Sequence, residues 1–155
     1  LNYVSVVYCL LTSALIVLSV LDFRTMEIAD GINLFILLLG IAATLLDLHA
    51  WKDHVIGMFS VSVFLLVIYL VTVGRGIGGG DIKLMFGAGL LLGWKGAVLA
   101  FFLGCIIGSV VHLIRMAVSH AEHRLAMGPY LSVGIWLTAL WGTPVIDWYI
   151  GMIIH

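Results

Sequence analysis

Gly74-Arg75-Gly76-Ile77-Gly78-Gly79-Gly80-Asp81 lies between two apolar runs, Val55–Val73 and Leu84–Trp94, and interrupts them with five glycines and two charged residues. The first run has about the length that a helix needs to cross a bilayer, roughly 20 apolar residues. Glycine-rich backbone at membrane depth is tolerated only where protein or a water-filled cavity covers it. The stretch therefore predicts a broken segment that precedes a short, glycine-rich fourth span of a helical membrane protein.

The composition of the whole chain agrees with a membrane location. Of its 155 residues, 63% are apolar and 10% are charged, and the mean hydropathy is +1.24. A soluble domain has about 45–50% apolar and about 25% charged residues. These values exclude a soluble monomer and a disordered chain, and a net charge of −1 gives no basic surface for nucleic acid. The lipid bilayer is the expected surrounding.

We expect an all-α, polytopic membrane helix bundle of about six transmembrane helices, in one domain that covers residues 1–155. Because the chain starts with Leu1, we interpret it as lacking an N-terminal segment. The terminal run Val145–Ile154 either extends the last span or lies along the membrane interface. The six expected spans are Tyr3–Leu21, Ile32–Leu46, Val55–Val73, Leu84–Trp94, Gly96–Val118 and Met127–Trp141.

The basic residues predict how these spans are oriented. Cytoplasmic loops carry an excess of Lys and Arg, and tryptophans gather at the membrane interfaces. Five of the seven basic residues fall in the first, third and fifth loops, namely Arg24, Arg75, Lys83, Arg115 and Arg124. These loops are therefore expected in the cytoplasm, with both ends of the chain and most tryptophans on the outer side.

Two carboxylates fall on the expected cytoplasmic side, where two distant parts of the chain meet. Asp22 directly follows the first span, and Asp81 lies between the third and the fourth. A charge at membrane depth costs about 2.5–3.5 kcal/mol on insertion scales. Two carboxyl groups a few ångströms apart do not both ionise easily, and such a pair can activate a water molecule and protonate a leaving amine. That is aspartyl protease chemistry, although both residues also fit ordinary charges at span ends, and the glycines fit a flexible loop.

Three segments resemble a known family. Gly78-Gly79-Gly80-Asp81-Ile82-Lys83 resembles the GxGDxK signature of type IV prepilin peptidases, membrane-embedded GxGD aspartyl proteases that are related to preflagellin peptidases. Asp22-Phe23-Arg24, followed by Ile28-Ala29-Asp30, resembles their first-aspartate motif, with Ala29 where the family has proline. Met127-Gly128-Pro129-Tyr130-Leu131 is similar to the segment that begins the family's last helix. The resemblance covers roughly residues 10–142.

The resemblance implies a multi-pass endopeptidase of the bacterial inner membrane, with its active site facing the cytoplasm. It would remove the leader peptide of prepilin or pilin-like precursors for a type IV pilus or a protein secretion system. No cofactor and no metal are implied. N-methylation is not expected of this chain, since the paired CxxC motifs of bifunctional members are absent from it. The implied catalytic pair is Asp22 and Asp81, and the implied supporting or substrate-binding residues are Gly78, Gly80, Lys83, Arg24, Glu27 and Asp30.

Two other classes of protein remain open. A small transporter or channel also places carboxylates and a broken helix in the membrane, but it predicts symmetric half-helix pairs, and the sequence shows one break and no repeat. A non-catalytic scaffold of a pilus or secretion machine would make both aspartates dispensable. His120-Ala121-Glu122-His123 has the spacing of two metal ligands, but a site needs a third, and a solvated loop is the favoured interpretation.

Overall fold

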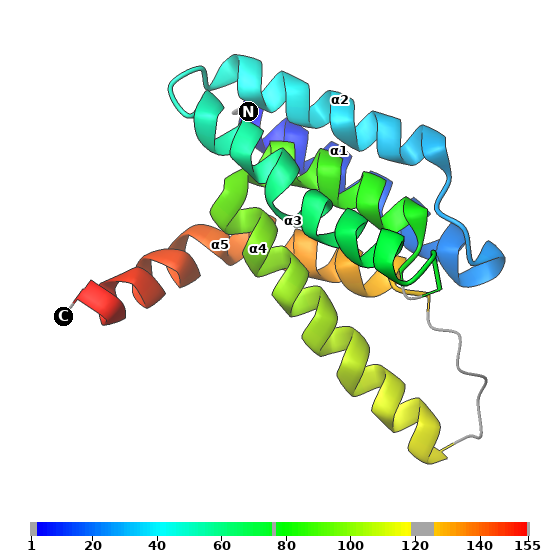
Figure 1. Ribbon diagram of the computed structural model, residues 1–155. Coiled ribbons are helices and arrows are strands. Elements are labelled where there is room, and N and C mark those ends of the chain that lie inside the picture. Colours follow the sequence, from blue (N-terminus) through cyan, green and yellow to red (C-terminus); the bar gives the residue numbers. More distant parts are fainter. Residues whose placement is uncertain (1–2, 76, 119–125, 155) are drawn as a thin grey trace.

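The computed structural model describes residues 3–75, 77–118 and 126–154, and this part of the chain contains helices and no strands. This confirms the expected all-helical fold class, whereas the count of about six transmembrane helices is not confirmed. Two of the expected spans lie in one element, as described below. The helices, shown in Figure 1, are α1 Tyr3–Thr25, α2 Asp30–Leu46, α3 Trp51–Val71, α4 Gly79–Val118 and α5 Gly128–Ile154.

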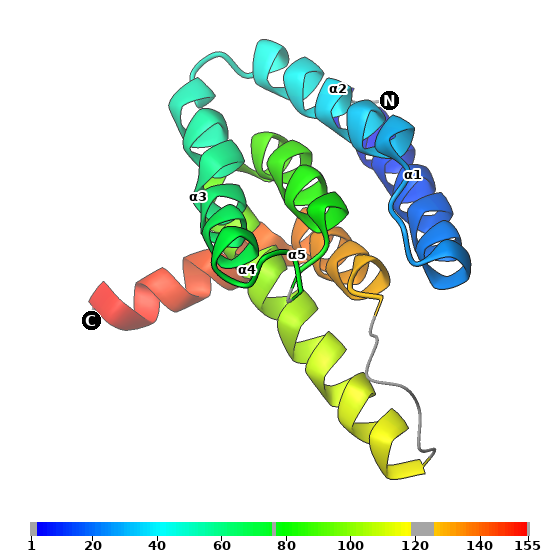
Figure 2. The ribbon, with the colours of Figure 1, turned by 45° about the vertical axis from the view of Figure 1, so that its right-hand side comes forward.

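Helix α4 contains both the fourth and the fifth expected spans, and it breaks at Gly93. Gly93 has φ 73° and ψ 174°, a conformation that residues with a Cβ rarely adopt. A straight helix from Gly79 to His112 would be about 50 Å long, yet both residues line one cavity. The chain therefore folds back at Gly93, as Figures 1 and 2 show for the green and yellow parts of α4.

Polar side chains from two neighbouring helices contact a backbone carbonyl oxygen near this break. A helical carbonyl close to a break loses its intrahelical donor and needs another partner. The Leu90 carbonyl lies 2.7 Å from the His54 ring Nδ1 and accepts a 3.5 Å hydrogen bond from the Thr44 hydroxyl. α3 and α2 thus cap the first part of α4.

Helix α4 forms the centre of the bundle. It packs against α2, α3 and α5, while α1 packs against α2 and α5. A Cβ on Gly89 would collide with the backbone of Gly57, so the crossing of α3 and α4 requires two small residues. The largest fully buried side chains form one core between the helices: Leu11, Leu18, Ile36, Leu65, Leu84, Met85, Leu131 and Ile135.

The outer surface of the bundle is apolar. Leu70 and Val71 at the end of α3 are 66% and 77% exposed, and large apolar side chains of every helix are exposed in the same way. Soluble monomers rarely expose contiguous apolar surface on this scale. α1, α3 and α4 are long and apolar enough to cross a membrane, and α2 is a shorter apolar helix. The surface and the helix lengths together indicate a membrane protein.

Helix α5 contains the sixth expected span and the terminal run in one element. It continues as a helix through Val145–Ile154. Pro144 lies inside it, and proline removes a backbone donor and bends a helix. The red part of α5 accordingly diverges from its orange part in Figure 1.

Candidate active site

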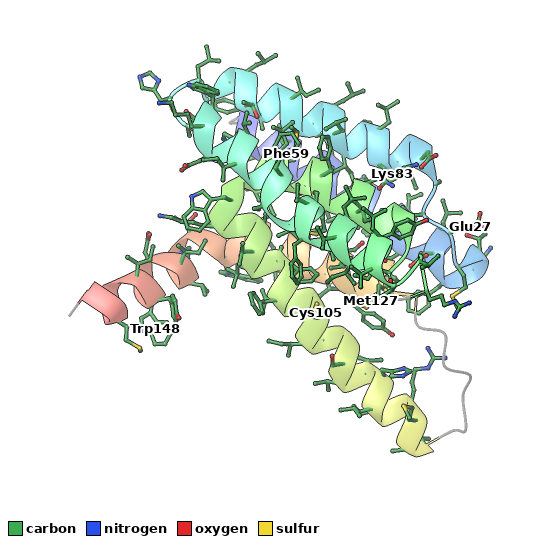
Figure 3. The ribbon with its side chains drawn as sticks, in the orientation of Figure 1. Glu27, Phe59, Lys83, Cys105, Met127 and Trp148 are labelled. Atoms are coloured by element: carbon green, nitrogen blue, oxygen red, sulfur yellow. The ribbon has the colours of Figure 1, made fainter. Side chains whose placement is uncertain are left out.

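A cavity of about 1020 Å³ opens where three segments of the chain meet. The segments are the end of α1 with the loop that follows it, the stretch from Gly74 to the start of α4, and the chain just before α5, with His112 of α4 beside them. Glu27 and Met127 line the cavity, and Lys83 lies two residues beyond Asp81; all three lie toward the same end of the bundle in Figure 3. The charged or titratable residues that line the cavity are Asp22, Glu27, Asp30, Arg75, Asp81 and His112.

Asp22 lies in the last turn of α1 and is held by a distant part of the chain. Its side chain is 4% exposed, and its Oδ2 accepts a 2.9 Å hydrogen bond from the backbone N–H of Gly128. Gly128 is the first residue of α5, and the first N–H groups of a helix have no intrahelical acceptor. The start of α5 therefore supplies the donor that orients the Asp22 carboxylate.

Asp81 lies in the first turn of α4 and is 7% exposed. Its backbone N–H donates a 3.1 Å hydrogen bond to the Gly78 carbonyl, and Gly78 supplies a backbone hydrogen bond to the Asp81 carboxylate. This reciprocal pattern resembles a capping box, in which a side chain of the first turn reaches back to the N-cap N–H. The helix start thus holds Asp81 in place.

The fold brings the two predicted carboxylates together. Asp22 and Asp81 line the same cavity, although they are 59 positions apart in the chain. Each carboxylate receives one backbone hydrogen bond from a glycine, Gly128 for Asp22 and Gly78 for Asp81. A carboxylate has two oxygens that accept hydrogen bonds. Each aspartate therefore keeps acceptor capacity for a water molecule in the cavity.

The glycines of the site differ in how much space surrounds them. A Cβ on Gly80 would lie 2.8 Å from the Ile28 Cβ, and a Cβ on Gly128 would collide with the Asp22 carboxylate. A Cβ on Gly78 would lie 3.3 Å from the Asp81 Oδ2, whereas one on Gly79 would meet nothing within 4 Å. Packing therefore requires glycine at 80 and 128, and it leaves position 79 free.

The other predicted residues lie at the rim of the cavity or outside it. Lys83 Nζ forms a 2.6 Å ion pair with Asp30 Oδ1, and both side chains are mostly exposed. Asp30 and Glu27 line the cavity, while Lys83 and Arg24 are not among the described residues that line it. Ala29 precedes α2 with φ −63° and ψ 125°. Proline has the same φ, so the turn keeps the geometry that a proline would impose.

Sequence reasoning gave no role to three residues near the site. Gly128 belongs to a segment with a family resemblance, but its bond to Asp22 depends on how α5 packs. Asn33 is a buried polar residue that contacts the start of α4, and His112 reaches the cavity only because α4 folds back. Among the residues that the structure describes, no three His, Cys, Asp or Glu side chains are placed to hold a metal ion. His120 and His123 lie outside the described residues.

These features define a class: helical membrane proteins with a buried pair of aspartates on one cavity. A model of the type IV leader peptidase family matches residues 9–113, a span that contains both aspartates, and the chain belongs to this family. The resemblance seen in the motifs is thereby confirmed. No solved structure matches this chain.

Relatives named prepilin leader peptidase/N-methyltransferase match most of this chain. One from Aeromonas salmonicida (strain A449) is 31% identical over 152 residues, covering 94% of this chain and 52% of the relative. One from Bacillus subtilis (strain 168) is 35% identical over 143 residues, covering 90% and 57%. One from Pseudomonas aeruginosa is 30% identical over 148 residues, covering 91% and 51%. The chain therefore spans about half the length of the curated relatives it matches.

Proposed function

We propose that this chain is a membrane-embedded aspartyl endopeptidase that removes the leader peptide of type IV prepilins or pilin-like precursors. The observation that carries the proposal is the pair of buried carboxylates, Asp22 and Asp81, on one open cavity. Membership of the type IV leader peptidase family and the names of the relatives support the same activity. The proposal concerns leader cleavage and does not include N-methylation.

The proposed reaction uses Asp22 and Asp81 as a catalytic pair that shares one proton. The ionised carboxyl group takes a proton from a water molecule while the water oxygen attacks the carbonyl carbon of the scissile peptide. The protonated carboxyl group donates its hydrogen to the carbonyl oxygen. The resulting diol then collapses: one of its hydroxyl groups returns a proton to the carboxylate that had given one up, the other carboxyl group protonates the amine nitrogen, and the C–N bond breaks. The amine and the new carboxyl group leave the site, and the pair again holds one proton.

The backbone donors give each carboxylate a fixed orientation during this reaction. The Gly128 N–H engages the Asp22 Oδ2, and Gly78 engages the Asp81 carboxylate. Preorganised donors stabilise charge without a reorganisation cost at the moment of reaction. The remaining oxygen of each group is then available to the water and the scissile carbonyl.

The cavity rim suits a basic leader peptide. Glu27 and Asp30 line the cavity and are exposed, so they offer negative charge to an approaching Lys- or Arg-rich segment.

Two basic residues bear on the orientation of the cavity in the membrane. Arg75 lines the cavity, and Arg24 lies in the last turn of α1. Basic residues around the opening support a cytoplasmic position for it. We infer an active site on the cytoplasmic face of the inner membrane.

The test is leader cleavage by single variants of the two aspartates. Purified Asp22→Asn and Asp81→Asn proteins are incubated with a pilin-like precursor in detergent or lipid, and leader removal is followed by gel mobility. Each variant is expected to lose at least about 100-fold in rate, since a positioned acid or base contributes about that much or more. The matched control is Asp147→Asn, which changes an exposed carboxylate of α5 that does not line the cavity.

Two results would replace the proposal with one of its rivals. If either aspartate variant cleaves at the unmodified protein's rate, the two-aspartate mechanism is wrong. If the unmodified protein itself cleaves no precursor, a non-catalytic scaffold is indicated. Aspartate-dependent ion flux into reconstituted vesicles, with no proteolysis, would indicate a transporter or channel.

A further inference from the structure

Asn33 is a buried polar residue close to the site but outside the cavity. It lies in the first turn of α2 and is 5% exposed. Its Nδ2 donates a 3.4 Å hydrogen bond to the backbone carbonyl of Gly80, 47 residues along the chain. The bond is long for an N–H···O contact, but burial strengthens such interactions because water does not compete for them.

The other half of the Asn33 amide has no partner among the residues that the structure describes. Within that part of the chain its Oδ1 is buried without a hydrogen bond, and an unsatisfied buried acceptor lowers stability. A leucine, which has the same branching and the same number of side-chain heavy atoms, would occupy the same core position without that penalty. Packing therefore does not account for an asparagine here, whereas the donor to Gly80 does.

The contact joins the first turn of α2 to the first turn of α4. On its inner side, Ile28 fills the space beside Gly80. On its outer side, the exposed Lys83–Asp30 ion pair connects the same two helix starts. The Gly80 carbonyl belongs to the peptide unit that carries the Asp81 nitrogen, so a group that holds this carbonyl also sets the position of Asp81.

We propose that Asn33 is a positioning residue of the active site, which acts through the Gly80–Asp81 peptide to set the placement of Asp81 relative to Asp22. The inference rests on the proposed function for its kinetic part only. Asn33 does not line the cavity, so it affects the chemical step and not substrate binding. A displacement of about 1 Å from the productive geometry costs on the order of 100-fold in rate.

The kinetic experiment compares Asn33→Asp with Asn33→Leu. Asn33→Asp keeps the shape and, when ionised, replaces the donor with an acceptor that faces the Gly80 carbonyl. Asn33→Leu removes the donor at every pH. Both are expected to lower kcat by about 10- to 100-fold near neutral pH, while KM changes by less than about threefold. The matched control is Ser62→Ala on α3, which removes a buried polar group that has no hydrogen-bond partner among the described residues, and which should keep the unmodified kcat.

The pH profile separates positioning from a general loss of structure. When the introduced carboxyl group of Asn33→Asp takes up a proton, its O–H becomes a donor again. We therefore take the ratio of the variant's kcat to the unmodified protein's kcat at each pH. This ratio should rise for Asn33→Asp as the pH is lowered, whereas for Asn33→Leu it should stay low. Asp30, Asp81 and Lys83, the charged residues at the two helix starts, are the same in all three proteins. Equal, pH-independent ratios for the two variants, or an Asn33→Leu kcat equal to the unmodified one, would overturn the proposal.

A second measurement does not depend on proteolysis. Hydrogen exchange of backbone amides in residues 79–85 should become at least about 10-fold faster in Asn33→Leu, because the first turn of α4 opens more often. Exchange in residues 96–108, beyond Gly93, should stay the same. If no precursor is cleaved but this pattern appears, the proposed function fails and the structural role of Asn33 stands. Unchanged exchange in residues 79–85 would refute that role.

Discussion

Adding a methyl group at Gly128 tests how α5 holds the Asp22 carboxylate. Among the described residues, the glycines with a positive φ are Gly74 and Gly93. Gly128 is not one of them, so its backbone conformation accommodates alanine. The obstacle is space, because the new Cβ would lie 2.9 Å from the Asp22 Cγ and would collide with its Oδ2. Either the carboxyl group rotates and loses its 2.9 Å hydrogen bond from Gly128, or the start of α5 shifts.

The size of the effect follows from these two responses. A hydrogen bond to a charged group is worth about 1.5–3 kcal/mol, and overpacking a dense site costs about 1–3 kcal/mol. Since each response relieves part of the other, we expect Gly128→Ala to lower the free energy of unfolding by about 2–4 kcal/mol. Leader cleavage should fall with it, because Asp22 no longer faces Asp81 in the same orientation.

A double-mutant cycle isolates the contact. Asp22→Ala removes the Cγ and Oδ2 and leaves a Cβ 3.3 Å from the new methyl group. In that background Gly128→Ala should cost less than about 1 kcal/mol, which gives a coupling of about 1–4 kcal/mol. Unfolding in mixed micelles, followed by circular dichroism during a denaturing-detergent titration, measures all four proteins.

The control for the added methyl group is Gly31→Ala in the first turn of α2, where a Cβ meets nothing within 4 Å. It should change the free energy of unfolding by less than about 1 kcal/mol. Equal losses from Gly128→Ala with and without the Asp22 carboxyl group would refute the reasoning, because the cost would then have another origin.

Three further predictions use the same unfolding assay. Gly80→Ala should lower the free energy of unfolding by about 1–3 kcal/mol, because the new Cβ overpacks against the α1–α2 loop. Gly79→Ala, whose Cβ has open space, should lower it by less than about 1 kcal/mol. Equal losses from the two variants would contradict this. Gly93→Ala should cost about 1–3 kcal/mol because of the φ of 73°, and an unchanged stability would show that the break does not need glycine. Lys83→Ala should cost less than about 1 kcal/mol, and the loss should shrink in 1 M salt, because its ion pair with Asp30 is exposed; a loss that does not depend on salt would argue against a surface ion pair.

Local sequence patterns predicted much of the site. The glycine-rich stretch and Asp81 were predicted to lie between two spans, with the fourth span beginning at Leu84, whereas α4 begins at Gly79 and has Asp81 in its first turn. The end of α1 near Asp22 could be predicted from the change from apolar to polar residues. The number of spans was harder to predict, because one positive φ at Gly93 decides how two apolar runs are connected. The φ of a glycine within a helical pattern cannot be derived from the sequence.

The sequence alone determined that the chain belongs in a membrane, that it is helical, and that Asp22 and Asp81 are its candidate catalytic pair. The first two properties follow from composition and apolar run length, and the candidate pair follows from the resemblance of its two motifs to those of type IV prepilin peptidases. Only the tertiary structure decided that Gly128 donates to Asp22, that Asn33 reaches Gly80 and that His112 lines the same cavity as Asp22 and Asp81. Each of these contacts joins residues that are 20 or more positions apart, on elements whose relative placement depends on helix packing. Such packing is set by side-chain volume across the whole core, and no local pattern encodes it.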